Sequence, residues 1–362
     1  MKKLWEIATC LLAAVVFFSG CTGVAASAAA AGAPVRPSGE VVLYCSMQEK
    51  QLRRLKAGFE AQYPEITLRY YYASTRKLLN KLAAEQQTAH VEADLVWADS
   101  PPDYIGLKEA GILTPYHSPE AAGLAPGFLE ESGYYTGARL FSFVIAYNTR
   151  LVPEEEAPKS WEALLEPRWR GQVVMADPAD AGSTGCFVGA MMLSEGYGSD
   201  YFSRLRENDC VLESSTSATH ARVARGDYPI GICLDYAVNT LAKNGETIAG
   251  IYPEEDMISV CGPIGLVADG PNPENARLLY DYILSMAGQE NLAASHLRSV
   301  RSDVAQSAPD LKNPLEASSL EQAALIYRYR QEALAAFDRI FFKVGLPGNR
   351  YSGARPDSAV IF

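Results

Sequence analysis

Histidine is scarce in this chain of 362 residues, which has only four, and its seven cysteines include no Cys-x-x-Cys pair. The sequence also lacks the His-Glu-x-x-His, Gly-x-Ser-x-Gly and P-loop patterns of zinc proteases, serine hydrolases and phosphate-binding enzymes. Cys45 follows a strand-like run and would be the candidate nucleophile of an enzyme, but no base is identifiable for it, so a core role is the simpler interpretation. We therefore expect no catalytic residue, no cofactor and no bound metal.

An excess of positive charge is missing too. Lysine and arginine number 32 against 43 acidic residues, a formal net charge of −11 that is spread without long acidic runs. Such a chain offers no positive field for nucleic acid, which excludes that class of partner, although a small local anion site remains possible. Apolar residues make up 48% of the chain, enough for a sizeable core, and the length suggests about two domains.

The first residues are typical of a bacterial export signal. Lys2 and Lys3 precede the apolar run Ile7–Phe18, which is too short to cross a membrane comfortably. Phe18-Ser19-Gly20-Cys21 resembles a lipobox, and the Ala-, Gly-, Ser- and Pro-rich run that follows lacks apolar periodicity. We expect a lipoprotein signal peptide at 1–20, lipidation of Cys21 and a flexible tether at 21–38. The protein would then be extracytoplasmic and anchored to the cell membrane. An uncleaved anchor, the alternative, would also leave the rest outside the cytoplasmic membrane.

Five cysteines remain after Cys21. Because their number is odd, at least one thiol must stay free even where disulfides can form. Their neighbours are apolar or small, so we expect most of them to be buried core residues. They are Cys45, Cys186, Cys210, Cys233 and Cys261.

Strand and helix patterns alternate through the first third of the chain after the tether. Strands are predicted at Glu40–Tyr44, Thr67–Tyr72 and Ala93–Ala98, each followed by a helical pattern, which favours a parallel sheet with helices on both faces. Small polar residues follow each strand, and the carboxyl ends of parallel strands share one edge, so these residues should line one crevice. They are Ser46, Ser74, Thr75, Asp99 and Ser100.

The stretch Asp177–Met192, later in the chain, shows the same pattern of a strand followed by small polar residues and a helix. A strand-like run precedes it, and a helix is predicted to begin near Ser183 with small residues in front. The free backbone N–H groups of a helix start can receive an anion, and the hydroxyls of Ser183 and Thr184 would add donors. The alternative is that one of these hydroxyls merely caps the helix.

Several motifs together resemble bacterial extracellular solute-binding proteins of ABC importers, in the branch with ferric-ion, 2-aminoethylphosphonate and sugar-phosphate binders. They occur in the family's order across roughly residues 40–305. The matching segments are Leu43–Glu49, Ala93–Trp97, Leu107–Tyr116, Ala146–Thr149, Ala157–Trp161, Arg168–Gly171, Gly226–Gly231 and Pro271–Glu274.

The resemblance implies the α/β, two-lobed type II periplasmic binding protein fold, with ligand between lobes joined by two crossing strands at about Phe141–Tyr147 and Val260–Val267. Lobe 1 would hold 39–140 plus 267–312, lobe 2 would hold 148–259, and 313–362 would be a helical segment packing on both. It also implies a monomer whose closed, loaded form is recognised by a membrane permease.

The family's ferric-ion binders carry a tandem Tyr-Tyr after the strand that ends here at Leu234, with a His and a Glu from the first lobe. This chain has Asp235-Tyr236 at the tandem position and Met47-Gln48 where the His would stand. Fe(III) prefers hard anionic oxygen ligands, so one phenolate is a poorer set than two. Ferric iron is therefore the alternative ligand.

The preferred ligand is a small organic anion with a phosphonate or phosphate group. Hydroxyls and helix starts would bind its head, His220 or Arg139 would supply positive charge, and carboxylates would accept from an amine or hydroxyls. Capping is the alternative for His220, and a surface ion pair for Arg139. A surface lipoprotein without ligand is a third class. The candidate residues are Ser46, Glu49, Ser74, Thr75, Asp99, Ser142, Ser183, Thr184, His220, Asp235 and Tyr236.

Overall fold

The structure of the protein is a computed structural model that describes residues 37–253, 257–305 and 320–342. The predicted signal peptide, Cys21 and nearly all of the predicted tether lie outside the described residues, and so do parts of the predicted C-terminal segment. None of the described helices is both long and apolar enough to span a lipid bilayer.

Three parallel strands and three helices form the first lobe, as the alternating pattern predicted. The strands lie in the order β2-β1-β3. Helix α1 shows why the pattern works, because Leu52, Leu55 and Phe59 recur on one side and are buried there. The elements are β1 (Gly39–Cys45), α1 (Glu49–Gln62), β2 (Ile66–Tyr72), α2 (Thr75–Thr88), β3 (Leu95–Trp97) and α3 (Pro101–Glu109).

The second lobe repeats the strand–helix design. Its elements are β6 (Val173–Ala176), α4 (Gly182–Leu193), α5 (Gly198–Glu207), β7 (Val211–Glu213), α6 (Thr216–Arg225), β8 (Ile230–Leu234), α7 (Asp235–Lys243) and β9 (Ile248–Ile251). The serine- and threonine-rich residues just before Ala221 are already helical. Helix α6 already begins at Thr216, because the Ser215 hydroxyl accepts a hydrogen bond from the backbone N–H of Ala218 at 3.1 Å.

Two long buried strands belong to both lobes, β5 (Thr136–Asn148) and β10 (Ser259–Val267). They pair antiparallel with each other; β5 also pairs with β8 and β9, and β10 with β3 and β4 (Leu113–Thr114). The resulting sheet has the order β2-β1-β3-β10-β5-β8-β6-β7. The two expected crossing segments lie within β5 and β10, and the expected two-lobed fold is confirmed. The residue boundaries of the lobes stay a prediction.

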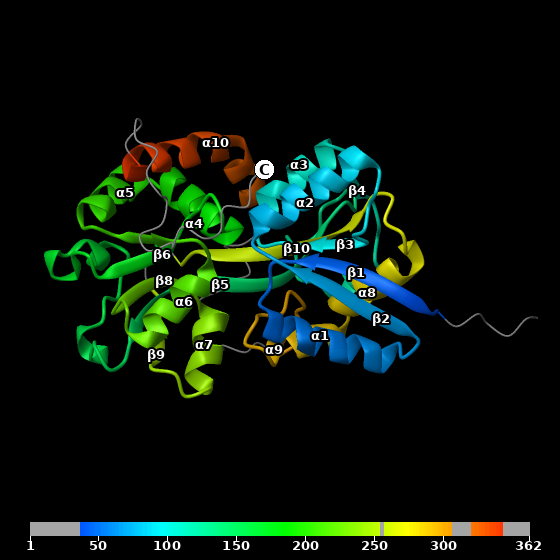
Figure 1. Cartoon of the computed structure of the whole chain (residues 1–362), viewed down its shortest axis with the longest axis horizontal. Helices are drawn as coiled ribbons and strands as arrows, with labels where there is room; N and C mark the ends of the chain where they lie inside the picture. The colour runs from blue at the N-terminus through cyan, green and yellow to red at the C-terminus, as the bar shows by residue number, and fades with distance from the viewer. Residues whose placement is uncertain (1–36, 254–256, 306–319, 343–362) are drawn as a thin grey trace, which may run out of the picture. The chain divides into compact units, whose positions relative to one another are not determined.

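The remaining helices cover the sheet on both faces (Figure 1). They are α8 (Pro273–Leu284), α9 (Met286–Ala293) and α10 (Leu320–Phe342), with short 3₁₀ turns at Pro119–Gly123, Glu154–Glu156, Glu162–Leu165 and Pro167–Trp169. Helix α8 ends at Leu284, because Ser285 is extended and its hydroxyl caps α9 by accepting from the N–H of Gly288 at 3.1 Å.

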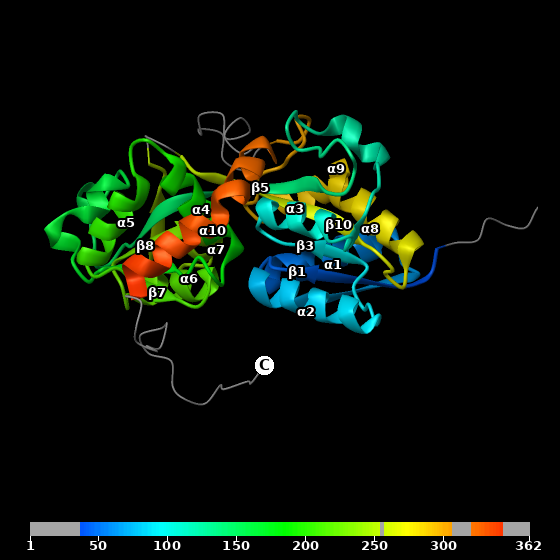
Figure 2. The same ribbon diagram turned by 90° about the horizontal axis from the view of Figure 1, so that it is seen from above.

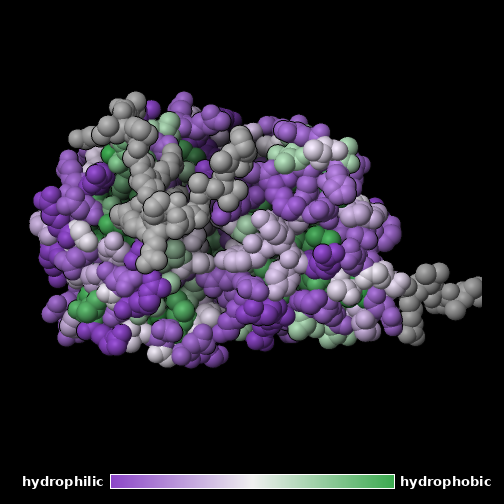
Figure 3. Space-filling view, in the orientation of Figure 1, coloured by the Kyte–Doolittle hydropathy of each residue, from purple (hydrophilic) through white to green (hydrophobic). Residues whose placement is uncertain are grey.

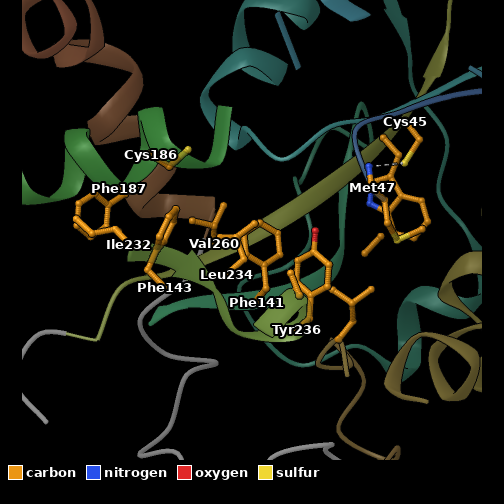
Figure 4. Packing of buried hydrophobic residues seen from close by; sticks show 14 of the residues in the cluster. Cys45, Met47, Phe141, Phe143, Cys186, Phe187, Ile232, Leu234, Tyr236 and Val260 are labelled. Carbon is orange, nitrogen blue, oxygen red and sulfur yellow. Dashed lines mark hydrogen bonds between the residues drawn. The ribbon is translucent and has the colours of Figure 1, made fainter. Parts of the chain in front are cut away.

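One cluster of buried apolar side chains extends from the first lobe through the crossing strands into the second lobe (Figure 4). Phe143 of β5 packs against Phe187 of α4 with ring centroids 4.8 Å apart, and Phe141 meets Tyr236 at 5.8 Å. All five cysteines are buried and unpaired, so the predicted core role is confirmed. Burial raises the pKa of the Cys45 thiol to about 11, which keeps it protonated at neutral pH.

Helix α10 contacts both lobes (Figure 2). Against the second lobe the contacts are apolar: Ile326 packs on Gly189, and Phe337 meets Phe202 with centroids 5.4 Å apart. A Cβ on Gly189 would lie 2.7 Å from Ile326, so glycine permits this close approach. Against α3 of the first lobe the contacts are polar, since the Tyr327 hydroxyl donates to Glu109 at 2.7 Å.

We predict that Phe337→Ala lowers the free energy of unfolding by about 3–5 kcal/mol, because a fully buried ring is replaced by a cavity. Denaturant unfolding followed by circular dichroism measures this change. Tyr329→Ala is the matched control on the same helix, because its ring is 39% exposed and its loss should cost less than about 1 kcal/mol. Equal losses in the two variants would contradict the packing of α10.

Candidate functional site

A small cavity of about 50 Å³ lies between the lobes, and we call it the interlobe cavity. Turns after β1, β2 and β3 line it from the first lobe, and the starts of α4 and α6 line it from the second. Its lining residues are Ser46, Tyr72, Ala73, Ser74, Thr75, Asp99, Ala181, Gly182, Ser183, Ser215, Thr216 and Ser217.

Three helices, α2, α4 and α6, begin at this cavity. Neither Ser74 before α2 nor Ala181 before α4 makes a side-chain capping bond, so the first-turn N–H groups there keep hydrogen-bonding capacity. Each helix start also carries partial positive charge. Seven of the lining residues bear a serine or threonine hydroxyl. The combination suits a small oxyanion whose oxygens accept several hydrogen bonds at once.

Asp99 is the one carboxylate among the residues that line the cavity, and Arg139 neutralises its charge. Its Oδ1 accepts from Nε of Arg139 at 3.0 Å and also pairs with Nη2, while its Oδ2 accepts from the Ser46 hydroxyl at 3.2 Å. Burial disfavours the charged guanidinium, but Asp99, together with the nearby Cys45 and Tyr236, holds the pKa of Arg139 above its ordinary value. The alternative of a surface ion pair for Arg139 is wrong, since the side chain is fully buried.

The two lobes lie close together at Gly182, the first residue of α4. A Cβ at this position would lie 2.8 Å from Thr75 and from the Cβ of Ser100, both in the first lobe. Only a residue without a side chain therefore fits between the lobes here.

Five of the eleven predicted site residues line the interlobe cavity together. They are Ser46, Ser74, Thr75, Asp99 and Ser183. Three others lie elsewhere. Glu49 is exposed on α1 and pairs with Arg53 at 3.0 Å, the Ser142 hydroxyl meets that of Ser259 at 2.5 Å, and Thr184 is buried in α4 outside the lining.

Asp235 and Tyr236 are also away from the lining. The Asp235 carboxylate accepts from Nη2 of Arg298 at 2.9 Å and from the backbone N–H of Ser142 at 3.0 Å. Burial raises the pKa of Asp235, and Arg298 opposes that shift. The ring of Tyr236 packs on Phe141, and burial raises the pKa of its phenol. These side chains hold the crossing strands to the second lobe.

His220 does not supply positive charge, so that expectation is wrong. Its Nε2 accepts a hydrogen bond from the backbone N–H of Leu234 at 3.0 Å, and burial lowers the pKa of the ring to about 3. The neutral imidazole fastens α6 to the end of β8. Its other nitrogen lies 3.5 Å from the Gln48 amide of the first lobe.

The sequence interpretation missed the serine-rich start of α6. Ser215, Thr216 and Ser217 reach the cavity, and the Ser217 hydroxyl lies 3.2 Å from that of Tyr72 across the lobes. The signal was the same strand-then-hydroxyl pattern used elsewhere, but β7 has only three residues and was not recognised. Within residues 37–253, 257–305 and 320–342 no three His, Cys, Asp or Glu side chains are placed to hold a metal ion.

A family model described as bacterial extracellular solute-binding protein matches residues 102–321. The chain belongs to this family. A relative from Salmonella paratyphi A, named as a putative 2-aminoethylphosphonate-binding periplasmic protein, is 25% identical over 67% of this chain and 72% of its own length. An Fe(3+)-binding periplasmic protein of Serratia marcescens is 23% identical over 71% and 77%.

The fold is similar to that of the periplasmic binding protein AfuA from Actinobacillus pleuropneumoniae, solved with fructose-6-phosphate. The TM-score is 0.69 at 21% identity, over 82% of this chain and 99% of that one. Together with the family match, this structural similarity confirms the predicted fold class and the predicted family.

We predict that His220 makes stability depend on pH. The folded-state pKa near 3 lies below the ordinary value of 6.5, so below pH 6.5 the unfolded chain binds the extra proton. The stabilisation is complete above pH 6.5 and is lost as pH falls toward 3, by about 1.4 kcal/mol per pH unit. His220→Gln should flatten this slope between pH 6 and 4 in denaturant titrations. His90→Gln, at an exposed position, is the control. An unchanged slope in His220→Gln would show that another group titrates.

Proposed function

We propose that this protein captures a small solute bearing a phosphonate or phosphate group in the interlobe cavity and delivers it to the permease of an ABC importer. The observation that carries the proposal is the convergence of three helix starts and seven hydroxyl side chains, from both lobes, on one cavity. A phosphonate head presents several acceptor oxygens and negative charge, which such donors match. The names of the Salmonella relative and of the AfuA complex support the same ligand class.

The proposed lobes are 39–140 with 267–312, and 148–259, with 313–362 packing on both. Small-molecule pockets typically measure about 300–1,000 Å³. The interlobe cavity measures about 50 Å³, so solute entry requires the lobes to separate about β5 and β10. The lobes would thus close to capture the solute and open to release it, without a catalytic step. We further propose that lipid attached to Cys21 anchors a monomer outside the cytoplasmic membrane.

Ferric iron is the less favoured cargo. The Serratia relative is named for it, but the donors around this cavity are neutral hydroxyls and one carboxylate that Arg139 already neutralises. Fe(III) prefers anionic oxygens, and Tyr236 is buried outside the lining.

The cargo proposal predicts selective stabilisation by oxyanion solutes. Differential scanning fluorimetry should show a raised melting temperature with 2-aminoethylphosphonate or fructose-6-phosphate, because a ligand that binds only the folded state stabilises it. Isothermal titration calorimetry should show at least about 100-fold weaker binding in Ser74→Ala/Ser183→Ala, since two hydrogen bonds are lost and each bond to a charged group is worth about 1.5–3 kcal/mol. Ser199→Ala, exposed on α5, should bind like wild type. Stabilisation by ferric citrate alone would overturn the proposal.

The closure proposal predicts that Gly182→Ala weakens binding without unfolding the protein. The added methyl group would meet Thr75 and Ser100 and hold the lobes apart, whereas alanine itself favours the helix. We expect at least about tenfold weaker binding of the same solute and no compaction on its addition by small-angle X-ray scattering. Gly196→Ala is the control, because only one atom lies within 4 Å of the place its methyl group would take, at 3.8 Å. Normal affinity and compaction in Gly182→Ala would refute closure at this contact.

A further inference from the structure

A second cavity, of about 460 Å³, lies between α1, α7 and the turn after α9. These three elements lie on the face of the sheet opposite α10, α2 and α4 (Figure 1). We call this cavity the basic pocket, after Lys50, Arg54, Lys243 and His296. The full lining is Lys50, Gln51, Arg54, Thr240, Lys243, Asn244, Ala294, Ser295 and His296.

The charged side chains that line the basic pocket are positive, whereas the whole chain has a negative net charge. No carboxylate lines it, although the chain has a formal net charge of −11. Among the described residues, Lys50, Arg54 and Lys243 form no ion pair. Lys243 and Lys50 both lie close enough to His296 to add to the effect of burial in lowering the pKa of its ring. Like charges held together without a counter-charge repel one another, and a bound anion would relieve that repulsion.

One buried side chain of the pocket lining, Gln51, carries a polar atom without a hydrogen-bond partner among the described residues. Gln51 is 2% exposed, lines the pocket, and its Oε1 has no hydrogen-bond partner among the described residues. Rotation of the amide would present its NH₂ group, a donor, to an anion instead. His296 has a φ of 64°, in the left-handed region that a residue with a side chain rarely adopts. Such backbone strain tends to be kept at functional sites.

Both lobes contribute to the basic pocket. Lys50 and Arg54 lie on α1 of the first lobe, and Lys243 and Asn244 lie at the end of α7 in the second. The Lys50 ammonium donates to Oδ1 of Asn244 at 3.2 Å, across the lobes. An anion bound here would touch both lobes at once, so it would bind the closed arrangement more tightly than an open one.

We propose that the basic pocket binds a small multivalent anion, with the charge pattern of a polyphosphate or tricarboxylate, and that this binding favours closure of the lobes. The volume lies within the usual range for small-molecule sites, about 300–1,000 Å³, which favours a compact solute over an extended acidic protein segment. Space-filling shows a hydrophilic surface over α1, in keeping with a solvent-accessible site (Figure 3).

The test uses inorganic pyrophosphate and citrate as probes of the full-length protein, at constant ionic strength. Calorimetry should show saturable binding to wild type and at least about tenfold weaker binding to Lys50→Gln/Lys243→Gln, since two charge-assisted contacts are removed. Arg150→Gln/Lys159→Gln removes the same charge from exposed positions and should bind like wild type. Equal affinities in all three proteins, or binding of a Glu-rich peptide in place of both probes, would overturn the proposal.

Two further measurements separate this pocket from the interlobe cavity. Ser74→Ala/Ser183→Ala should keep its pyrophosphate affinity; loss there, with normal binding in Lys50→Gln/Lys243→Gln, would assign the anion to the other cavity and refute the inference. Small-angle X-ray scattering should show compaction of wild type on adding pyrophosphate and none in Lys50→Gln/Lys243→Gln. Binding without compaction would refute the coupling to closure.

Discussion

The buried pair of Asp99 and Arg139 is the interaction on which the site depends. It joins the end of β3 to the crossing strand β5, and the guanidinium lies 4.8 Å above the ring of Trp97. On β10, Gly262 leaves the room that the pair needs, since a Cβ there would lie 2.8 Å from both partners. The same carboxylate fixes Ser46 at the cavity. Removing one partner of a buried pair typically costs about 3–5 kcal/mol, so the base of the cavity is a rigid part of the molecule.

A second buried pair joins Asp235 of the second lobe to Arg298, which lies in the segment proposed for the first lobe. Arg298 exchanges two backbone hydrogen bonds with Leu140 of β5, and Asp235 accepts from the N–H of Ser142 farther along the same strand. Both lobes are thus held to the crossing strands by an aspartate–arginine pair. Because the charged groups of both pairs neutralise each other, the interlobe cavity is lined mainly by hydroxyls and helix starts. The anion preference that we propose for it would come from peptide dipoles rather than from a cationic side chain.

Most of the fold and about half of the candidate site residues could be predicted from the local sequence. The true positions of the other candidate residues could not. Ser46, Ser74 and Ser183 were predictable because each lies in the segment between a strand and the following helix or in that helix's first turn, and parallel strands bring their carboxyl ends to one edge. Asp235 and Ser142 looked equally suitable as ligand donors. Their real partners lie 63 and 93 residues away along the chain, a separation at which no periodicity or spacing gives a signal. Likewise, nothing near His220 in the sequence indicates that the N–H of Leu234 needs an acceptor.

Away from the crossing strands and the buried pair of Asp235 and Arg298, the contacts between the lobes are of a different kind. Arg76 pairs with Asp180, Tyr72 with Ser217, and Lys50 with Asn244, and each involves an exposed side chain. Exposed polar contacts of this kind contribute about 0–1 kcal/mol each. Helix α10 also contacts α3 of the first lobe through polar groups, including the ion pair of Arg330 with Asp103. In the mechanism we propose, the lobes separate while both buried pairs persist, and an anion that reaches across the gap would supply the free energy that favours the closed arrangement.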